Sequence, residues 1–453
     1  MGPGTIPERL NPRPRPSTPT RRRTTASRDA GRRSDLKPQL ALVGMLAVGF
    51  AIVVPRGPWS TAPRAEPPAI SRRGVLGGAD YLIEVPANWR GGLVAFAHAV
   101  QRGPGPGTVV APPLGSHIVA HGHAWIASGY RAREYQPHLF IEDLVALREH
   151  FLKEIGPPRW TIIYGQALGG HVVVASLELR PGLYQGGLAE CGAVDGIGIV
   201  DYLLAYTAAA EFIAGVPLLD APDQPTFARL LNERVVPALG MPGSYTARGR
   251  QFDSVVKYLM GADEAGHDLP LRLRSLERDY LWKMTRRDPD VEKEPMPFRR
   301  AGSTLHIRYR IDPGLGLGED ELNPRVRRLR PAQDARSPSA NPVYAERTGR
   351  LTVPLLTLHE TGDARVPLSL EQSYRHRTVA AGTDHLLVQR VIRASSHCGF
   401  DGETRERAFD DLVAWIERGV RPDGDDVLAR DLSRVGLKWT RILDPEDPLF
   451  PRR

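Results

Sequence analysis

From about residue 74, short apolar runs alternate with longer stretches in which apolar residues recur every three or four positions. The short runs predict buried strands; they lie at residues 81–86, 92–97, 160–164, 187–191, 351–358 and 386–392. The longer stretches predict helices; they lie at residues 121–130, 141–155, 368–380 and 403–418. Because strands and helices alternate, we expect an α/β fold in which a mostly parallel sheet is flanked by helices.

Residues 197–348 interrupt this alternation with helical patterns that have no strand between them. Those patterns cover residues 199–214, 225–239 and 271–285, and a loop rich in arginine and proline follows at 323–339. The simplest account is a helical cap inserted between two strands of the sheet. The cap divides the predicted core into residues 74–196 and 349–420, and residues 421–453 are expected to form a polar tail on the surface.

The formal charge of +8 comes from the first part of the chain. Residues 1–61 hold 11 of the 60 basic residues and 3 of the 52 acidic ones, which leaves 49 of each in the remainder. A protein that binds nucleic acid needs clustered positive charge. The neutral body of this chain therefore gives no support for DNA or RNA as a partner.

The basic leader has the pattern of an export signal. Residues 1–38 are rich in Pro, Arg, Thr and Ser and are expected to be disordered, because they cannot bury a core. Residues 39–65 are interpreted as a signal or anchor segment with a linker, since the apolar run at 40–54 suits a signal peptide better than a membrane span. The preceding residues 32–37, Arg-Arg-Ser-Asp-Leu-Lys, resemble a twin-arginine motif. We expect a secreted, periplasmic or cell-envelope protein. One alternative is that residues 40–54 remain as an uncleaved membrane anchor, which would be the only membrane contact expected. The other is that the start of translation is assigned too far upstream, so that the first residues are not part of the protein.

Residues 165–170, Gly-Gln-Ala-Leu-Gly-Gly, carry the strongest chemical signal. A predicted strand leads into them and an apolar helical run leads out, which is the context of a G-x-S-x-G nucleophile elbow. The flanking glycines allow helix and strand to pass closely without a Cβ clash. In an ester hydrolase the central residue is serine, whereas this chain has Ala167.

Two further candidates follow predicted strands later in the chain, Asp363 in Gly-Asp-Ala-Arg-Val-Pro and His397 in His-Cys-Gly-Phe. Catalytic groups of parallel α/β sheets collect at the carboxyl ends of strands, and the order nucleophile, acid, histidine is that of α/β-hydrolases. Taken singly, Asp363 would be interpreted as a helix cap and His397 as an ordinary loop histidine. Together with the elbow they predict a Ser-His-Asp scaffold.

These motifs resemble those of secreted α/β-hydrolases of the serine esterase type, distantly those of tannases and feruloyl esterases, over about residues 75–420. The resemblance implies the α/β-hydrolase fold. It also implies that Asp363 orients His397, which would take the proton of the nucleophile and return it to the leaving group. The implied oxyanion hole uses the backbone N–H of Leu168 and that of Ala99 or Val100.

The chain has two cysteines, Cys191 and Cys398. The sequence alone leaves two alternatives, one disulfide in an exported chain or two buried free thiols. Tannase-like esterases tie the loop of the catalytic histidine with a disulfide, but their second cysteine immediately precedes the serine, where this chain has Gln166. The resemblance therefore implies a bridge from Cys398 to Cys191, at the end of the strand after the elbow.

Three histidines, His117, His121 and His123, are close enough in sequence to suggest a metal site. No carboxylate or cysteine cluster accompanies them along the sequence, and zinc needs three or four well-placed ligands. We therefore expect no metal and no other cofactor, and a small ester-like molecule as the ligand.

Because alanine lacks Oγ, no acyl-enzyme can form at position 167. Three explanations are open: an engineered Ser→Ala exchange in an active esterase, a natural pseudoenzyme that binds a ligand, and a general-base enzyme that uses His397 and Asp363 without a covalent intermediate. The expected function is that of an exported protein of the carboxylic ester hydrolase lineage. Hydrolysis by this chain itself is in question.

Overall fold

The structure is a computed structural model. It describes residues 69–440 except for 100, 102–104, 134–135, 242–243, 262–297, 338, 340–341, 344–345 and 395. The predicted leader and export segment, the predicted helix at 271–285 and the candidate oxyanion residue Val100 lie outside the described residues. So does the end of the predicted tail.

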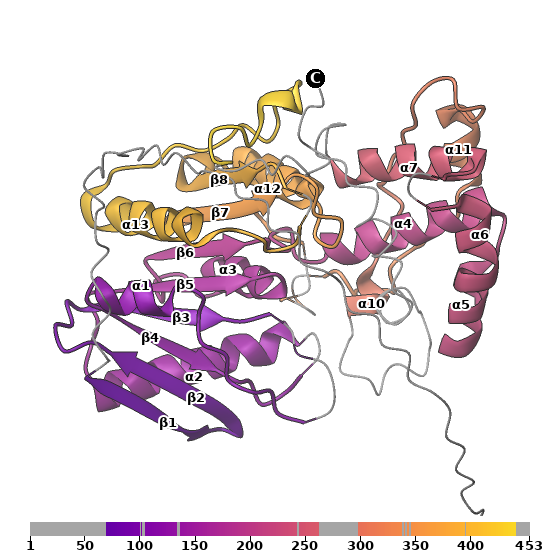
Figure 1. The fold of residues 1–453 in the computed structure, drawn as a ribbon. Coiled ribbons are helices and arrows are strands. Elements are labelled where there is room, and N and C mark those ends of the chain that lie inside the picture. Colours follow the sequence, from indigo (N-terminus) through magenta and orange to yellow (C-terminus); the bar gives the residue numbers. More distant parts are fainter. Residues whose placement is uncertain are drawn as a thin grey trace, which may run out of the picture. The chain divides into compact units, whose positions relative to one another are not determined.

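An eight-stranded sheet in the order β1-β2-β4-β3-β5-β6-β7-β8 forms the centre of the fold (Figure 1). The first three strands of that order pair antiparallel, and the remaining pairs are parallel. The strands are β1 (Ile70–Leu76), β2 (Ala79–Val85), β3 (Gly92–Ala97), β4 (His123–Ser128), β5 (Trp160–Gln166), β6 (Gly186–Glu190), β7 (Leu355–Glu360) and β8 (Leu387–Ile392).

Helices connect the parallel strands. Those of the core are α1 (Gly115–Ala120), α2 (Pro137–Glu154), α3 (Leu168–Leu179), α12 (Leu368–Ala381), η4 (Asp384–Leu386), α13 (Gly402–Arg418) and η5 (Leu432–Arg434). Those between β6 and β7 are α4 (Gly198–Ala214), η1 (Leu218–Asp220), α5 (Gln224–Leu230), η2 (Leu231–Val235), α6 (Val236–Leu239), α7 (Ala247–Met260), α10 (Phe298–Ala301) and α11 (Glu319–Arg325). Within the described part of the chain, no helix is long and apolar enough to cross a membrane.

The sheet is covered on both faces, and alternate residues of each strand serve opposite faces. In β3, Leu93 and Ala95 belong to the apolar cluster that includes residues of α2, α3 and α12, whereas Val94 and Phe96 belong to the cluster that includes residues of α1 and α13. Burial of apolar surface on both sides stabilises the sheet and places the carboxyl ends of its parallel strands at one edge.

The predicted helix at residues 121–130 is wrong, because this segment contains strand β4. Every residue of β4 is buried, with Ala124 and Ile126 on one face of the sheet and Trp125 and Ala127 on the other. A strand buried on both faces loses the apolar–polar alternation that distinguishes it from a buried helix. The edge strand β1 was not predicted, and β7 begins four residues later than the predicted strand.

The helices between β6 and β7 form the inserted cap around their own apolar cluster. Nearly all of α4 is buried, and its cluster includes Ala364 and Val366 from the loop after β7. The hydroxyl of Tyr202 in α4 donates a hydrogen bond of 3.0 Å to the carbonyl oxygen of Ala364. The cap therefore contacts the core next to the predicted acid residue, Asp363.

Part of the predicted surface tail packs on the edge strand β8. The Asp425 N–H donates to the carbonyl oxygen of Gln389, and its carboxylate accepts from the N–H of Val391 at 2.9 Å. Trp439 is also buried. These contacts satisfy backbone groups of an edge that would otherwise be open to pairing with another chain.

The turn from β5 into α3 brings backbone against backbone. A Cβ at Gly165 would lie 2.4 Å from the carbonyl oxygen of Gly169, and a Cβ at Gly169 would lie 2.1 Å from that of Ala97. A Cβ at Gly170 would lie 2.4 Å from the Cα of Gly192. Glycine is therefore required where α3 crosses the ends of β3 and β6. This strand–elbow–helix unit in a mostly parallel, helix-flanked sheet confirms the expected α/β-hydrolase fold.

Replacing Gly169 with alanine should lower the free energy of unfolding by about 1–3 kcal/mol, because the added methyl group overlaps the Ala97 carbonyl. Gly402→Ala is the matched control, since the nearest atom to its Cβ would be 4.0 Å away and it lies at the start of α13. Urea unfolding of both variants measures the difference. Equal stabilities would contradict the close approach at the elbow.

Candidate active site

The candidate residues occupy the loops that follow four neighbouring strands. Ala167 follows β5, Cys191 follows β6, Asp363 follows β7 and His397 follows β8. Since β5, β6, β7 and β8 are adjacent and parallel, these loops lie side by side at the carboxyl edge of the sheet. The structure thus brings together residues separated by more than 200 positions in the sequence.

Ala167 has the strained backbone of an elbow residue, with φ 52° and ψ −120°. Its N–H donates to the carbonyl oxygen of Glu190 at 2.9 Å, and its own carbonyl oxygen accepts from Gly170 at 2.9 Å. A positive φ is uncommon for residues other than glycine, and such strain tends to occur at functional sites. Cys191 and Cys398 also have positive φ, so three strained residues meet here.

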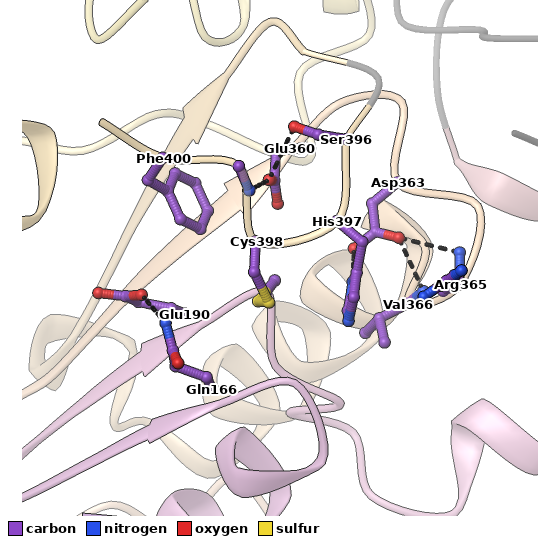
Figure 2. Close-up of a disulfide and its surroundings, with 12 residues drawn as sticks. Gln166, Glu190, Glu360, Asp363, Arg365, Val366, Ser396, His397, Cys398 and Phe400 are labelled. Carbon is purple, nitrogen blue, oxygen red and sulfur yellow. Dashed lines mark hydrogen bonds and ion pairs between the residues drawn. A yellow bond between two sulfur atoms is a disulfide. The ribbon is translucent and has the colours of Figure 1, made fainter. Parts of the chain in front are cut away.

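Asp363 and His397 form a close hydrogen-bonded pair (Figure 2). The Nδ1 atom of His397 lies 2.6 Å from Oδ2 of Asp363, whose side chain is fully buried. The other carboxylate oxygen accepts from the N–H groups of Arg365 and Val366, at 2.9 and 3.1 Å. Asp363 therefore both stabilises its own loop and selects the tautomer of His397 that has the proton on Nδ1 and the lone pair on Nε2.

Burial and neighbouring charge shift the pKa of His397 in opposite directions. Burial lowers the pKa of its imidazole, but the negative charge and hydrogen bond of Asp363, with a further contribution from Glu360, outweigh burial and raise the pKa above its ordinary value. The site thus favours the imidazolium form more than water does. Stabilised imidazolium is what a histidine needs if it accepts a proton during a reaction.

A disulfide joins Cys191, directly after β6, to Cys398, directly after His397 (Figure 2). Their Cα atoms are 5.3 Å apart, and a ring nitrogen of His397 lies within 4.8 Å of both sulfur atoms. Ala167, Cys191 and Cys398 belong to one packed cluster. The bridge therefore ties the histidine loop to the strand that neighbours the elbow.

A pair of charged residues, Arg405 and Glu190, supports the loop that carries His397. Glu190 is fully buried and accepts from Arg405 Nε at 3.0 Å, from Gln166 Nε2 at 2.7 Å and from the hydroxyl of Tyr164 at 2.8 Å. The guanidinium of Arg405 also donates to the carbonyl oxygens of Cys398 and Phe400. One buried charge pair therefore connects the elbow strand β5, strand β6 and the histidine loop.

Glu360, the last residue of β7, contacts the histidine loop from its other side. Its Oε1 accepts from the N–H of Gly399 at 2.6 Å and from the hydroxyl of Ser396 at 3.3 Å (Figure 2). Its buried Oε2 has no hydrogen-bond partner among the described residues. Burial, with a smaller contribution from the charge of Asp363, raises the pKa of Glu360 to about 7.

The acid loop has a separate buried support. Nε2 of His359 lies 2.7 Å from the carbonyl oxygen of Val366, and Nδ1 of His359 lies 3.5 Å from Oε1 of Glu371. Burial lowers the pKa of His359, but Glu371 more than offsets this and raises the pKa to about 9. Protonated His359 can donate from both nitrogens, so it holds the loop that carries Asp363.

The predicted oxyanion residues are only partly described. Leu168 is the first residue of α3, and the first N–H groups of a helix have no acceptor within the helix. Ala99 is exposed and follows His98, whose carbonyl oxygen would lie 3.1 Å from a Cβ on Gly169. The loop after β3 thus lies against the start of α3, while Val100 lies outside the described residues.

Sequence reasoning missed the buried supports Glu190, Glu360, His359 and Arg405. A signal was present for two of them, since Glu190 and Glu360 each end an apolar strand. A charged residue at the buried end of a parallel strand needs a partner nearby, which marks a polar site. Arg405 has no such signal, because it lies among other charged residues of α13.

No protein-family model and no curated protein matches the sequence. Solved structures of similar architecture include an acylaminoacyl peptidase from Pyrococcus horikoshii, with 13% identity and a TM-score of 0.38 over 79% of this chain and 43% of the peptidase. Feruloyl esterase B from Aspergillus oryzae has 12% identity and a TM-score of 0.40 over 77% of this chain and 80% of the esterase. A hormone-sensitive lipase from a metagenome library has 14% identity and a TM-score of 0.40 over 80% and 87%. The chain spans less than half the length of the peptidase, and the fold assignment rests on the sheet itself.

Glu360→Gln should become progressively more stable than the unaltered chain as the pH rises from about 4.5 to 7. The glutamine oxygen can still accept from Gly399, whereas the glutamate ionises over this range in the unfolded chain and stays mostly protonated in the folded one. Because the pKa of Glu360 is raised on folding, its ionisation costs stability above its unfolded pKa, by roughly 2–3 kcal/mol once it is complete. Unfolding free energies at pH 4.5 and pH 8 measure this. A constant difference between the two proteins would contradict a titrating carboxyl at this position.

Proposed function

We propose that this chain derives from a serine carboxylic ester hydrolase and that alanine at position 167 silences hydrolysis while the site still binds small ester-like molecules. One observation carries the proposal: a hydrogen-bonded His397–Asp363 pair stands beside an elbow whose central residue keeps φ 52° without a hydroxyl group. If Asp363 only capped a helix and His397 only lay in a loop, neither the hydrogen bond between them nor the strained backbone of Ala167 would be required.

Each group has a role in an ester hydrolase of this kind. Asp363 would hold the imidazole, and Nε2 of His397 would accept the proton of a hydroxyl at position 167 and return it to the leaving alcohol. The N–H of Leu168, at the positive end of α3, would stabilise the oxyanion together with an N–H of Ala99 or Val100. With Ala167 in place there is no oxygen to attack the carbonyl carbon, so these groups surround the ligand without a covalent step.

The apolar surroundings of the site favour an apolar or aromatic ester. Leu168 packs with the cap cluster that also holds Ala364 and Val366. Leu168 comes from the elbow helix, and Ala364 and Val366 come from the acid loop, so a ligand at the site would lie beside these two apolar segments. Apolar walls with a few placed polar groups are typical of small-molecule sites.

A second candidate function is general-base catalysis by His397 without a nucleophile. The intact pair and the raised pKa of His397 favour it, because Asp363 stabilises the imidazolium that proton abstraction would create. In that case the substrate itself would supply the acidic proton and no acyl-enzyme would form.

We also propose that the chain is exported. The Cys191–Cys398 disulfide supports export, because structural disulfides persist in oxidising compartments and are rare in the reducing cytosol. The twin-arginine-like motif at 32–37 and the apolar run at 40–54 point the same way.

The direct test compares p-nitrophenyl ester hydrolysis by the unaltered chain and by Ala167→Ser. We expect burst kinetics and a rate at least ~10³-fold higher for the variant, since loss of a triad serine costs on the order of 10⁶ in turnover. Adding Asp363→Asn to Ala167→Ser should remove most of this gain, because loss of the triad aspartate lowers turnover by up to about 10⁴-fold.

Three other outcomes are informative. If Ala167→Ser is inert, the site is not that of an ester hydrolase. If both proteins are inert but bind the esters, the site is a ligand-binding site and does not derive from an ester hydrolase. If the unaltered chain hydrolyses esters and loses this activity with His397→Ala, the general-base candidate is correct and the proposed silencing is wrong.

A further inference from the structure

Two histidines and two carboxylates face each other between α1 and α13, on a different part of the core from the elbow. His117 and His121 are four residues apart on α1 and its C-terminal end, and Glu406 and Asp410 are four residues apart on α13. Residues at this spacing lie on the same face of a helix. Nε2 of His117 is 2.8 Å from Oδ1 of Asp410, and its Nδ1 is 3.8 Å from Oε2 of Glu406.

The three nearest groups are close enough to share a metal ion after side-chain rotation. One ligand atom from each of His117, His121 and Asp410 lies within 4.8 Å of the other two. Ligands at zinc–nitrogen and zinc–oxygen distances of about 2.1 Å are separated by about 3.4 Å in a tetrahedron. Nε2 of His117 and Oδ1 of Asp410, now 2.8 Å apart, would have to separate to bind one ion, and Asp410 is 48% exposed, so its side chain is free to rotate.

The outer hydrogen bonds also suit a metal ion. Nδ1 of His121 lies 2.9 Å from the carbonyl oxygen of His117, which accepts its proton and leaves the lone pair of the ring on Nε2. Oε2 of Glu406 lies 3.8 Å from Nδ1 of His117, beyond hydrogen-bond distance, but its side chain is 46% exposed and can move closer to accept that proton. Histidines that bind metals usually donate their second ring N–H to a carbonyl or carboxylate, because this fixes the tautomer and raises the basicity of the ligating nitrogen.

We propose that His117, His121 and Asp410 bind one divalent transition-metal ion of the zinc type, with water as a fourth ligand and Glu406 as the hydrogen-bond partner of His117. Two imidazole nitrogens exclude magnesium and calcium as the preferred ions, since these take oxygen ligands. The ion would link α1, which follows the loop after β3, to α13, which follows the histidine loop. It would therefore stabilise the packing of the two helices that follow candidate oxyanion and catalytic-histidine segments.

The sequence showed the histidines but not their carboxylate partner. His117 and Asp410 are 293 positions apart, and only the packing of α1 and α13 on the same face of the sheet brings them together. The third histidine of the sequence pattern does not belong to the site. His123 is buried in β4, where its ring centroid lies 4.8 Å from that of Trp160.

The test is a calorimetric titration of the full, tag-free chain with ZnCl₂ after treatment with a chelator. We expect one zinc ion per chain and no binding of MgCl₂. His121→Ala and Asp410→Asn should each weaken zinc binding by at least ~10-fold. His376→Ala is the matched control, because it removes an exposed histidine of α12 and should leave zinc binding unchanged.

Melting temperatures separate loss of the ion from a folding defect. With chelator present, all four proteins should melt within a few degrees of one another, because the replaced side chains are at least partly exposed. Zinc should raise the melting temperature of the unaltered chain and of His376→Ala, but not that of the other two variants. An unaltered chain that binds no zinc, or His121→Ala and Asp410→Asn chains that bind it as tightly as the control, would overturn the proposal.

Discussion

At the elbow, α3 passes so close to the ends of β3 and β6 that no side chain fits between them. Gly169 touches the backbone of Ala97, and Gly170 touches that of Gly192. This contact fixes the first turn of α3 relative to the loops after β3 and β6, and with it the backbone N–H of Leu168. The apolar cores on both faces of the sheet then hold the strand ends in register, so the chemistry of the site depends on backbone packing that only glycine permits.

Buried charged groups complete the arrangement, because loops at a strand edge have few apolar contacts of their own. The Arg405–Glu190 pair and Glu360 hold the histidine loop, and His359 holds the acid loop. Isolated charges are costly to bury, so each of these groups is paired or accepts backbone hydrogen bonds. None of these supports involves the side chain at position 167. Alanine there leaves the strained backbone and the supporting network in place, and removes one oxygen atom from the site.

The sequence predicted most of the fold and the principal site residues, because their signals are local. The elbow glycines, the acid loop of Asp363 and the late His397 each sit within a few residues of a strongly apolar strand, and their order along the chain is informative. The prediction of a helix at strand β4 was wrong, because a strand buried on both faces does not show the alternation of apolar and polar residues. The support from Arg405, and the pairing of His117 with Asp410, depend on helices and loops that meet only after folding. Such contacts have no local pattern to reveal them.

If the site lacks only a hydroxyl group at position 167, restoring that hydroxyl should restore a reactive serine. Labelling with an alkyl fluorophosphonate, followed by intact and peptide mass spectrometry, tests this most directly, since the reagent phosphonylates a serine Oγ and releases fluoride only where a neighbouring base takes the proton. The unaltered chain should take no label, Ala167→Ser should take one label at position 167, and adding His397→Ala should remove that label. An unlabelled Ala167→Ser protein that is folded, or a label at another residue, would contradict this expectation.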